Sequence, residues 1–120
     1  MTRKAYIVNA FSLNMLPDIN DGEVVEACIS KLPTHEARKL IKPPYIEAIS
    51  YLGHEAIAVR ASNDLGLNLP VNRSTLRLDG AESTLVVCQY RGPRLPEGAT
   101  ELPEGAIIEY YYVYLKVTRW

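Results

Sequence analysis

The stretch YIEAISYLGHEAIAVRASNDLG, residues 45–66, decides the fold class because it predicts a strand that runs directly into a helix. Its first part, residues 45–51, is typical of a strand, and Gly53 ends it. From His54 onward, apolar residues recur at four-residue spacing, which is the pattern of one buried helix face, and Gly66 is a typical residue to end the helix. The apolar positions of this helix are Ile57, Ala61 and Leu65.

The rest of the chain adds strands and one more helix around this unit. A short helix is predicted over residues 35–41, and Pro43-Pro44 ends it. Apolar runs rich in β-branched residues predict strands at 5–8, 23–29, 74–78, 84–90 and 107–117. Of these, the segments before and after Asp79-Gly80 are expected to form a β-hairpin. The order predicts a single α+β domain over residues 1–120, α/β-like in character, with a mixed, roughly five-stranded sheet flanked by helices.

The composition is that of a soluble globular protein, since 48% of the residues are hydrophobic and 22% are charged. The net charge of −1 argues against a protein that grips duplex DNA, because each contacted phosphate needs a nearby cation. No apolar run approaches the ~18 residues that cross a bilayer, and the N-terminal residues lack the apolar stretch of a signal peptide. We therefore expect a cytoplasmic protein whose partners include neither duplex DNA nor a membrane.

The cysteines and histidines are too sparse to predict a disulfide framework or a metal site. Cys28 and Cys88 lie far apart, each within an apolar, strand-like segment, so we expect buried and reduced thiols. The histidines are His35 and His54, and neither has a second Cys or His at the spacing of metal ligands. Any chemistry is therefore expected to proceed without a bound metal or another cofactor.

His54 is the first candidate for chemistry because it follows Gly53 at the predicted junction between strand and helix. The free N–H groups of a first helical turn, together with the helix dipole, favour an anion such as phosphate. A histidine beside a bound phosphate can be held protonated and can donate its proton to a leaving oxygen. The alternative is a histidine that only begins a helix.

Arg73 and Arg94 are the second candidates, since one stands just before a predicted strand and the other just after one. Arginines at strand ends can converge on one rim and bind phosphates through paired hydrogen bonds. Glu97 could orient the histidine or hold a ribose hydroxyl. It belongs to the first of two LPEGA copies, residues 95–99 and 102–106, which predict consecutive turns. The alternative is that all three charged side chains are solvated surface residues.

Four short blocks in this chain resemble the viral ring nuclease family, which is also known as a family of type III anti-CRISPR proteins. The first, NAFSLNML, follows directly after the first predicted strand. It contains Ser12 and Asn14, which lack the adjacent His or Lys that would make a nucleophile. The blocks are NAFSLNML at residues 9–16, LGHEA at 52–56, VNR at 71–73 and RLPEG at 94–98.

The resemblance implies a homodimeric enzyme that binds cyclic tetraadenylate across its two-fold axis. It implies metal-independent cleavage to linear diadenylates with a 2′,3′-cyclic phosphate, which switches off type III CRISPR signalling in the cytoplasm of a prokaryotic host cell. His54 would be the general acid, the ribose 2′-hydroxyl the nucleophile, and Glu97 would orient the histidine or the substrate. The residues expected to bind the ligand are Asn9, Ser12, Asn14, Arg73 and Arg94.

Two other functions remain open from the sequence. One is a binding protein that sequesters a cyclic oligonucleotide without turning it over. The other is a viral structural or interaction protein that uses its last strand as a contact surface. Alternate positions of that strand carry tyrosines, which are more typical of a core or a dimer seam than of a platform for nucleobases. These tyrosines are Tyr110, Tyr112 and Tyr114.

Overall fold

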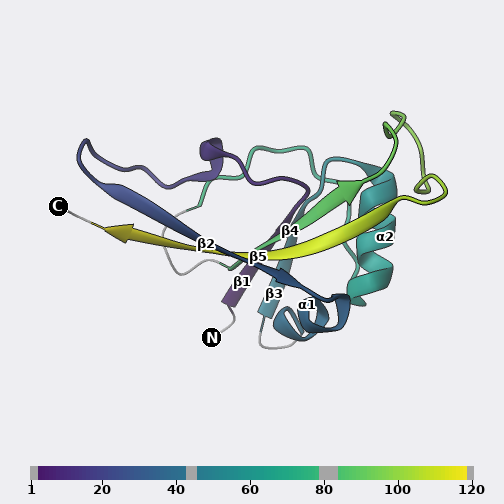
Figure 1. Cartoon of the computed structure of the whole chain (residues 1–120), viewed down its shortest axis with the longest axis horizontal. Coiled ribbons are helices and arrows are strands. Elements are labelled where there is room, and N and C mark those ends of the chain that lie inside the picture. Colours follow the sequence, from purple (N-terminus) through teal and green to yellow (C-terminus); the bar gives the residue numbers. More distant parts are fainter. Residues whose placement is uncertain (1–2, 43–45, 79–83, 119–120) are drawn as a thin grey trace.

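The computed structural model describes residues 3–42, 46–78 and 84–118, which form a five-stranded mixed sheet with two helices (Figure 1). The strands are β1 (Arg3–Val8), β2 (Val24–Leu32), β3 (Ile46–Tyr51), β4 (Thr84–Arg91) and β5 (Ile107–Thr118). The helices are α1 (Thr34–Leu40) and α2 (Glu55–Leu65), with a short 3-10 turn, η1 (Leu13–Met15). Neither helix is long and apolar enough to span a membrane. The predicted α+β fold with a mixed five-stranded sheet is confirmed.

The strand directions decide where the site can form. The spatial order is β2-β5-β4-β1-β3. Strand β1 runs parallel to both of its neighbours, β3 and β4, whereas β5 is antiparallel to β4 and to β2. The carboxyl ends of parallel strands meet at the same edge of a sheet, and ligands commonly bind there. The segments that follow β1, β3 and β4 therefore share one edge.

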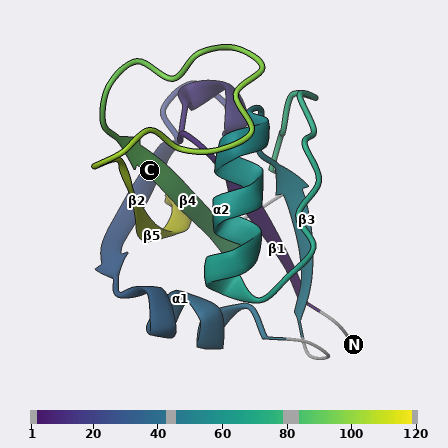
Figure 2. The same ribbon diagram turned by 90° about the vertical axis from the view of Figure 1, so that its right-hand side faces the viewer.

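Both helices cover the same face of the sheet (Figure 2). On α2 the predicted core positions are almost completely buried, with Ile57 5%, Ala61 0% and Leu65 2% exposed. The helix ends at Gly66, whose φ of 68° is left-handed as a glycine cap requires. Tyr110 of β5 packs beneath it, and its hydroxyl donates to Asp64 Oδ2 at 2.7 Å. Burial of the phenol and this hydrogen bond raise the pKa of Tyr110.

The predicted hairpin of residues 74–78 with 84–90 is wrong. The first segment forms no strand, and β4 pairs instead with β1 and β5, which occupy both of its edges. Leu76 and Leu78 are nevertheless buried, at 4% and 2% exposure, because the segment packs on the face opposite the helices. The Leu78 N–H donates to the Met15 carbonyl at 2.9 Å. The alternating pattern therefore indicated correctly that one side of the segment is buried, but the segment does not pair as a strand. The predicted Asp79-Gly80 turn lies outside the described residues.

The two cysteines differ in burial, so the expectation of two buried thiols is half wrong. Cys88 lies on the central strand β4 and is fully buried, whereas Cys28 is exposed and free. Cys28 is on β2, an edge strand whose residues are mostly exposed. Desolvation raises the pKa of the Cys88 thiol to about 12. The apolar neighbours of Cys28 in the sequence indicated a strand correctly, but not which face of it would be covered.

We expect iodoacetamide at pH 8 to alkylate Cys28 in the native protein and to leave Cys88 unmodified. The thiolate is the reactive form, and Cys88 is both buried and held protonated. Mass spectrometry of the native and the urea-unfolded protein measures this difference. A Cys28→Ser variant should remain unlabelled until it is unfolded. Rapid labelling of that native variant would contradict the packing of β4.

Candidate functional site

The predicted site residues gather at the edge where β1, β3 and β4 end. Asn9 follows β1, His54 follows β3 after a two-residue link, and Arg94 lies in the loop after β4. Arg73 reaches the same edge from the segment after α2. The loop after β4 arches over the N-terminal end of α2 (Figure 2). Segments that are distant in the sequence thus meet at one place.

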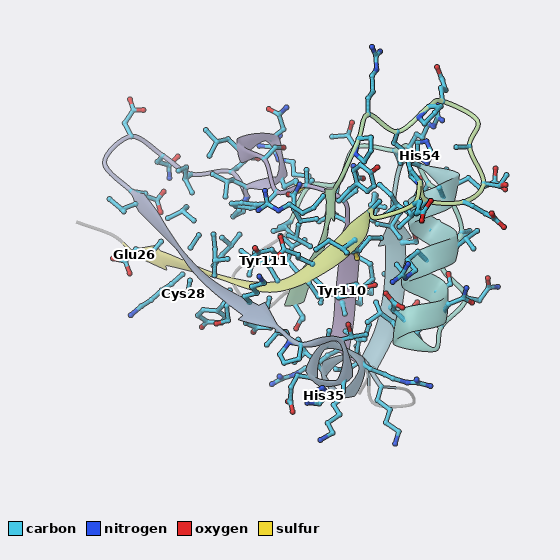
Figure 3. The ribbon with its side chains drawn as sticks, turned by 45° about the vertical axis from the view of Figure 1, so that its right-hand side comes forward. Glu26, Cys28, His35, His54, Tyr110 and Tyr111 are labelled. Atoms are coloured by element: carbon cyan, nitrogen blue, oxygen red, sulfur yellow. The ribbon has the colours of Figure 1, made fainter. Side chains whose placement is uncertain are left out.

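His54 is the N-cap of α2, the residue just before its first turn. Its Nδ1 accepts a hydrogen bond from the Ala56 N–H at 3.1 Å, which satisfies one of the free donors of the helix start. Its Nε2 lies 2.9 Å from the Pro96 carbonyl oxygen, so we assign the ring proton to Nε2, which donates to that carbonyl. The side chain lies between α2 and the loop after β4 (Figure 3). His54 itself therefore occupies one of the N–H groups at the helix start that an anion was expected to bind.

Arg73 is held beside the histidine by backbone contacts. Val71 forms an isolated parallel bridge with Leu52, and the Asn72 N–H donates to the Leu52 carbonyl at 2.9 Å. Arg73 Nε then donates to the Gly53 carbonyl at 3.1 Å. The guanidinium group is consequently fixed next to the backbone that carries the imidazole.

The loop after β4 contains two identical turns, as the LPEGA repeat predicted. The Ala99 N–H donates to the Pro96 carbonyl at 3.2 Å, and the Ala106 N–H donates to the Pro103 carbonyl at 3.1 Å. A turn of this kind needs a positive φ at its third residue, which glycine adopts without strain. These residues are Gly98 at 85° and Gly105 at 82°.

The first of these turns contacts His54 and Arg73. Its Pro96 carbonyl accepts from His54, while the Glu97 carboxylate lies 3.6 Å from Arg73 Nη1. Glu97 is 86% exposed and Arg73 64% exposed, so this ion pair is a weak and easily exchanged contact. Glu97 therefore faces the arginine, and the backbone of the preceding residue contacts the histidine.

Four predicted residues line one pocket of about 570 Å³, which we call the central pocket. They are His54, Glu97, Arg73 and Arg94. Two guanidinium groups against one carboxylate leave an excess of positive charge, which suits a phosphate ligand. In the described part of the chain, no three His, Cys, Asp or Glu side chains come together to hold a metal ion. The residues lining the central pocket are His54, Arg73, Arg94, Leu95, Pro96 and Glu97.

A second pocket, of about 360 Å³, contains the three predicted residues of the first loop and is called the Asn9 pocket. It shares Arg73 with the central pocket. The Asn9 Oδ1 atom accepts a hydrogen bond from the Gly53 N–H at 3.2 Å, which ties the loop to the residue before His54. Other lining residues include Ser12, Asn14, Tyr51, Ser74 and Thr75. The two pockets therefore adjoin at Arg73.

Two residues that matter to this geometry were not singled out from the sequence. Asn72 donates through Nδ2 to the Ser50 carbonyl at 3.0 Å and accepts through Oδ1 from the Ser74 N–H at 3.0 Å, and it thereby positions Arg73. Its place in the VNR block was the available signal. Pro96 acts through its backbone carbonyl, which no side-chain pattern reveals.

Comparison with known proteins adds a family to this geometry. No curated protein matches the chain. Among solved structures, B116 of Sulfolobus turreted icosahedral virus has a TM-score of 0.66 and 23% sequence identity, covering 92% of this chain and 98% of that chain. At this identity the likeness shows a shared fold. A family model described as STIV B116-like matches residues 5–112, so the chain belongs to the STIV B116-like family.

Proposed function

We propose that this protein is a metal-independent ring nuclease that cleaves cyclic tetraadenylate and thereby switches off type III CRISPR signalling. The observation that carries the proposal is the convergence of His54, Arg73, Arg94 and Glu97 on the central pocket. These residues come from distant segments, and the polar Asn9 pocket adjoins them. The sequence blocks that resemble ring nucleases all fall at this edge. A cytoplasmic location in a prokaryotic host cell belongs to the same proposal.

The proposed reaction needs a proton donor and an aligned phosphate, but no nucleophile from the protein. The ribose 2′-oxygen bonds to the adjacent phosphorus in line as the bond from phosphorus to the 5′-oxygen breaks. The 5′-oxygen receives the electron pair of that bond and a proton from the imidazolium form of His54, which becomes neutral imidazole, while the proton of the 2′-hydroxyl passes to solvent. The products are linear diadenylates that end in a 2′,3′-cyclic phosphate. Alignment and proton transfer are both established sources of large rate gains.

The present contacts of His54 suit this role in one respect. Its Nε2 already donates to an oxygen, the Pro96 carbonyl, which lies at the wall of the central pocket. A leaving 5′-oxygen that takes the place of this carbonyl would meet the same N–H, and protonation of Nδ1, which would give up its bond to the Ala56 N–H, would make the ring a proton donor. Arg73 and Arg94 would bind the phosphate oxygens, and Glu97 would orient the histidine or the ribose.

A homodimer is part of the proposal because of the symmetry of the ligand. Cyclic tetraadenylate carries four phosphates, and two copies of the chain would supply four arginines from Arg73 and Arg94. Two-fold symmetry would place two opposite phosphates of the ring at two equivalent His54 side chains. Each protomer would then cleave one phosphodiester, and the ring would be released as two halves.

A protein that sequesters the ring without cleaving it is the second candidate. One observation favours it: both ring nitrogens of His54 are engaged, with Ala56 N–H on Nδ1 and the Pro96 carbonyl on Nε2. Donation to substrate requires the ring to leave the carbonyl. If binding did not displace Pro96, the arginines would still hold the ligand but the proton would stay in place.

One assay separates these functions. We expect cyclic tetraadenylate, incubated with the protein in excess EDTA, to disappear within minutes and to yield diadenylate 2′,3′-cyclic phosphate, measured by chromatography with mass spectrometry. Cyclic triadenylate and hexaadenylate in parallel report the preference for ring size. Tight binding with intact rings would establish sequestration instead. If the protein neither binds nor cleaves any of the rings, a structural or interaction protein is the function that remains.

A further inference from the structure

A third pocket, of about 580 Å³, lies along α2 and is called the helix groove. It runs between α2 and the segment that follows it, and it meets the central pocket at His54 and Arg73, which line both. The residues expected to bind the ring do not include any that line this groove alone. Its lining includes Ala58, Val59, Asn63, Asn68, Leu69 and Val71.

The lining of the helix groove combines apolar surface with free carboxamides. Leu69 is 4% exposed, whereas Val59 and Val71 remain 44% and 41% exposed although they are large and apolar. The side-chain carboxamides of Asn63 and Asn68 have no hydrogen-bond partner within the described residues. A largely apolar surface with a few polar groups is typical of a small-molecule site. A carboxamide can pair with the N6 and N7 atoms of adenine, so this groove suits a purine base.

The groove is held rigid on both sides. Ser62 Oγ accepts from the Leu69 N–H at 3.0 Å and donates to the Leu69 carbonyl at 3.4 Å, which fastens α2 to the following segment. The Leu67 N–H donates to the Ser62 carbonyl at 3.1 Å. Beyond it, Val71 is fixed by its bridge to Leu52. Little ordering is therefore needed when a base enters, which favours binding.

The three pockets meet at Arg73 in a definite arrangement. Arg73 lines all three of them, but His54 lines only the central pocket and the helix groove, not the Asn9 pocket. A phosphodiester joins two nucleosides, one through its 3′-oxygen and the other through its 5′-oxygen. In an in-line displacement the attacking and leaving oxygens lie on opposite sides of phosphorus. The leaving 5′-oxygen must lie on the side of the proton donor, and His54 borders the helix groove but not the Asn9 pocket.

We propose that the helix groove binds the base of the nucleoside that carries the leaving 5′-oxygen, with Asn63 and Asn68 reading its amino edge. The Asn9 pocket takes the other nucleoside, the one whose 2′-hydroxyl attacks. This inference rests on the proposed function and adds a direction to it.

A ring with alternating adenosine and inosine tests the direction. Inosine replaces the 6-amino donor of adenine by a carbonyl acceptor, so a groove that reads adenine should cut where adenosine lies on the 5′-oxygen side. We expect products that end mainly in inosine 2′,3′-cyclic phosphate, roughly tenfold or more over the adenosine form, because one such pair is worth about that much discrimination. Single-turnover reactions analysed by mass spectrometry measure the ratio. The double variant Asn63→Ala, Asn68→Ala should lower it about tenfold.

The matched control is Asn20→Ala, because Asn20 is also an exposed asparagine but lies in the turn before β2, outside the three pockets. Its ratio should equal that of the unaltered protein, and thermal unfolding followed by circular dichroism verifies that all variants fold. An even ratio, or one that the double variant does not change, would overturn the groove assignment while cleavage itself leaves the proposed function standing. Products ending in adenosine 2′,3′-cyclic phosphate would overturn the direction. Failure to cleave even the all-adenosine ring would overturn both proposals.

Discussion

Replacing His54 by asparagine is expected to lower the single-turnover cleavage rate of cyclic tetraadenylate by at least about a hundredfold, the usual worth of a general acid. Asparagine has no proton that it can give to a leaving oxygen at neutral pH. It is, however, among the best N-cap residues, so it can replace Nδ1 as the acceptor of the Ala56 N–H. The substitution therefore removes the proposed chemistry and keeps the helix start.

Alanine at the same position separates the two roles of His54. His54→Ala removes the acid and the cap together, and loss of an N-cap costs about 1 kcal/mol of the free energy of unfolding. We expect both variants to lose activity equally, but only the alanine variant to unfold at a lower temperature. If His54→Asn kept the full single-turnover rate, the histidine would have only its structural role. If both variants bind the ring as tightly as the unaltered protein does, the lost step follows binding.

The fold was largely predictable because its strands and helices bury their apolar residues with clear periods. The helix from residue 55 buries Ile57 and Leu65 as the four-residue spacing required. The predictions fail where the burial of a side chain depends on segments that are distant in the sequence. Leu76 and Leu78 alternate like a strand, yet they are buried against the sheet face without strand pairing. The exposure of Cys28 depends on the place of β2 at the sheet edge, which local sequence does not encode.

The meeting of the candidate residues at one edge of the sheet could be foreseen from the sequence, but their contacts could not. His54 and Arg94 were chosen because they stand next to strand ends, and parallel strands bring such ends to one edge. The contact between His54 and the Pro96 carbonyl depends on a turn folding back over α2, a long-range event with no local signal. The pairing of Glu97 with Arg73 arises from the same turn. Residue type and strand order thus indicated where the candidate residues would meet, and loop geometry decided their hydrogen bonds.

Removing Arg73 is expected to weaken the binding of cyclic tetraadenylate more than removing any other cation of the described chain, because it alone lines all three pockets. Hydrogen bonds to a charged group are worth about 1.5–3 kcal/mol, so Arg73→Ala should raise Kd roughly ten- to a hundredfold. Arg73→Lys keeps the charge but loses the fork of donors, and we expect an intermediate Kd. Arg94→Ala should weaken binding in the same direction.

These affinities are best measured by calorimetry in the His54→Asn background, where the ligand is not consumed. Arg77→Ala is the matched control, since Arg77 lies on the same segment, is 61% exposed against 64% for Arg73, and pairs with Asp18 away from the pockets. Any effect of net charge alone appears equally in both variants, whereas a direct contact with phosphate appears only in Arg73→Ala. The affinity lost by Arg73→Ala should also shrink as salt concentration rises, because phosphate contacts are screened. An Arg73→Ala protein that binds as tightly as Arg77→Ala would mean that the ligand does not touch the junction of the three pockets.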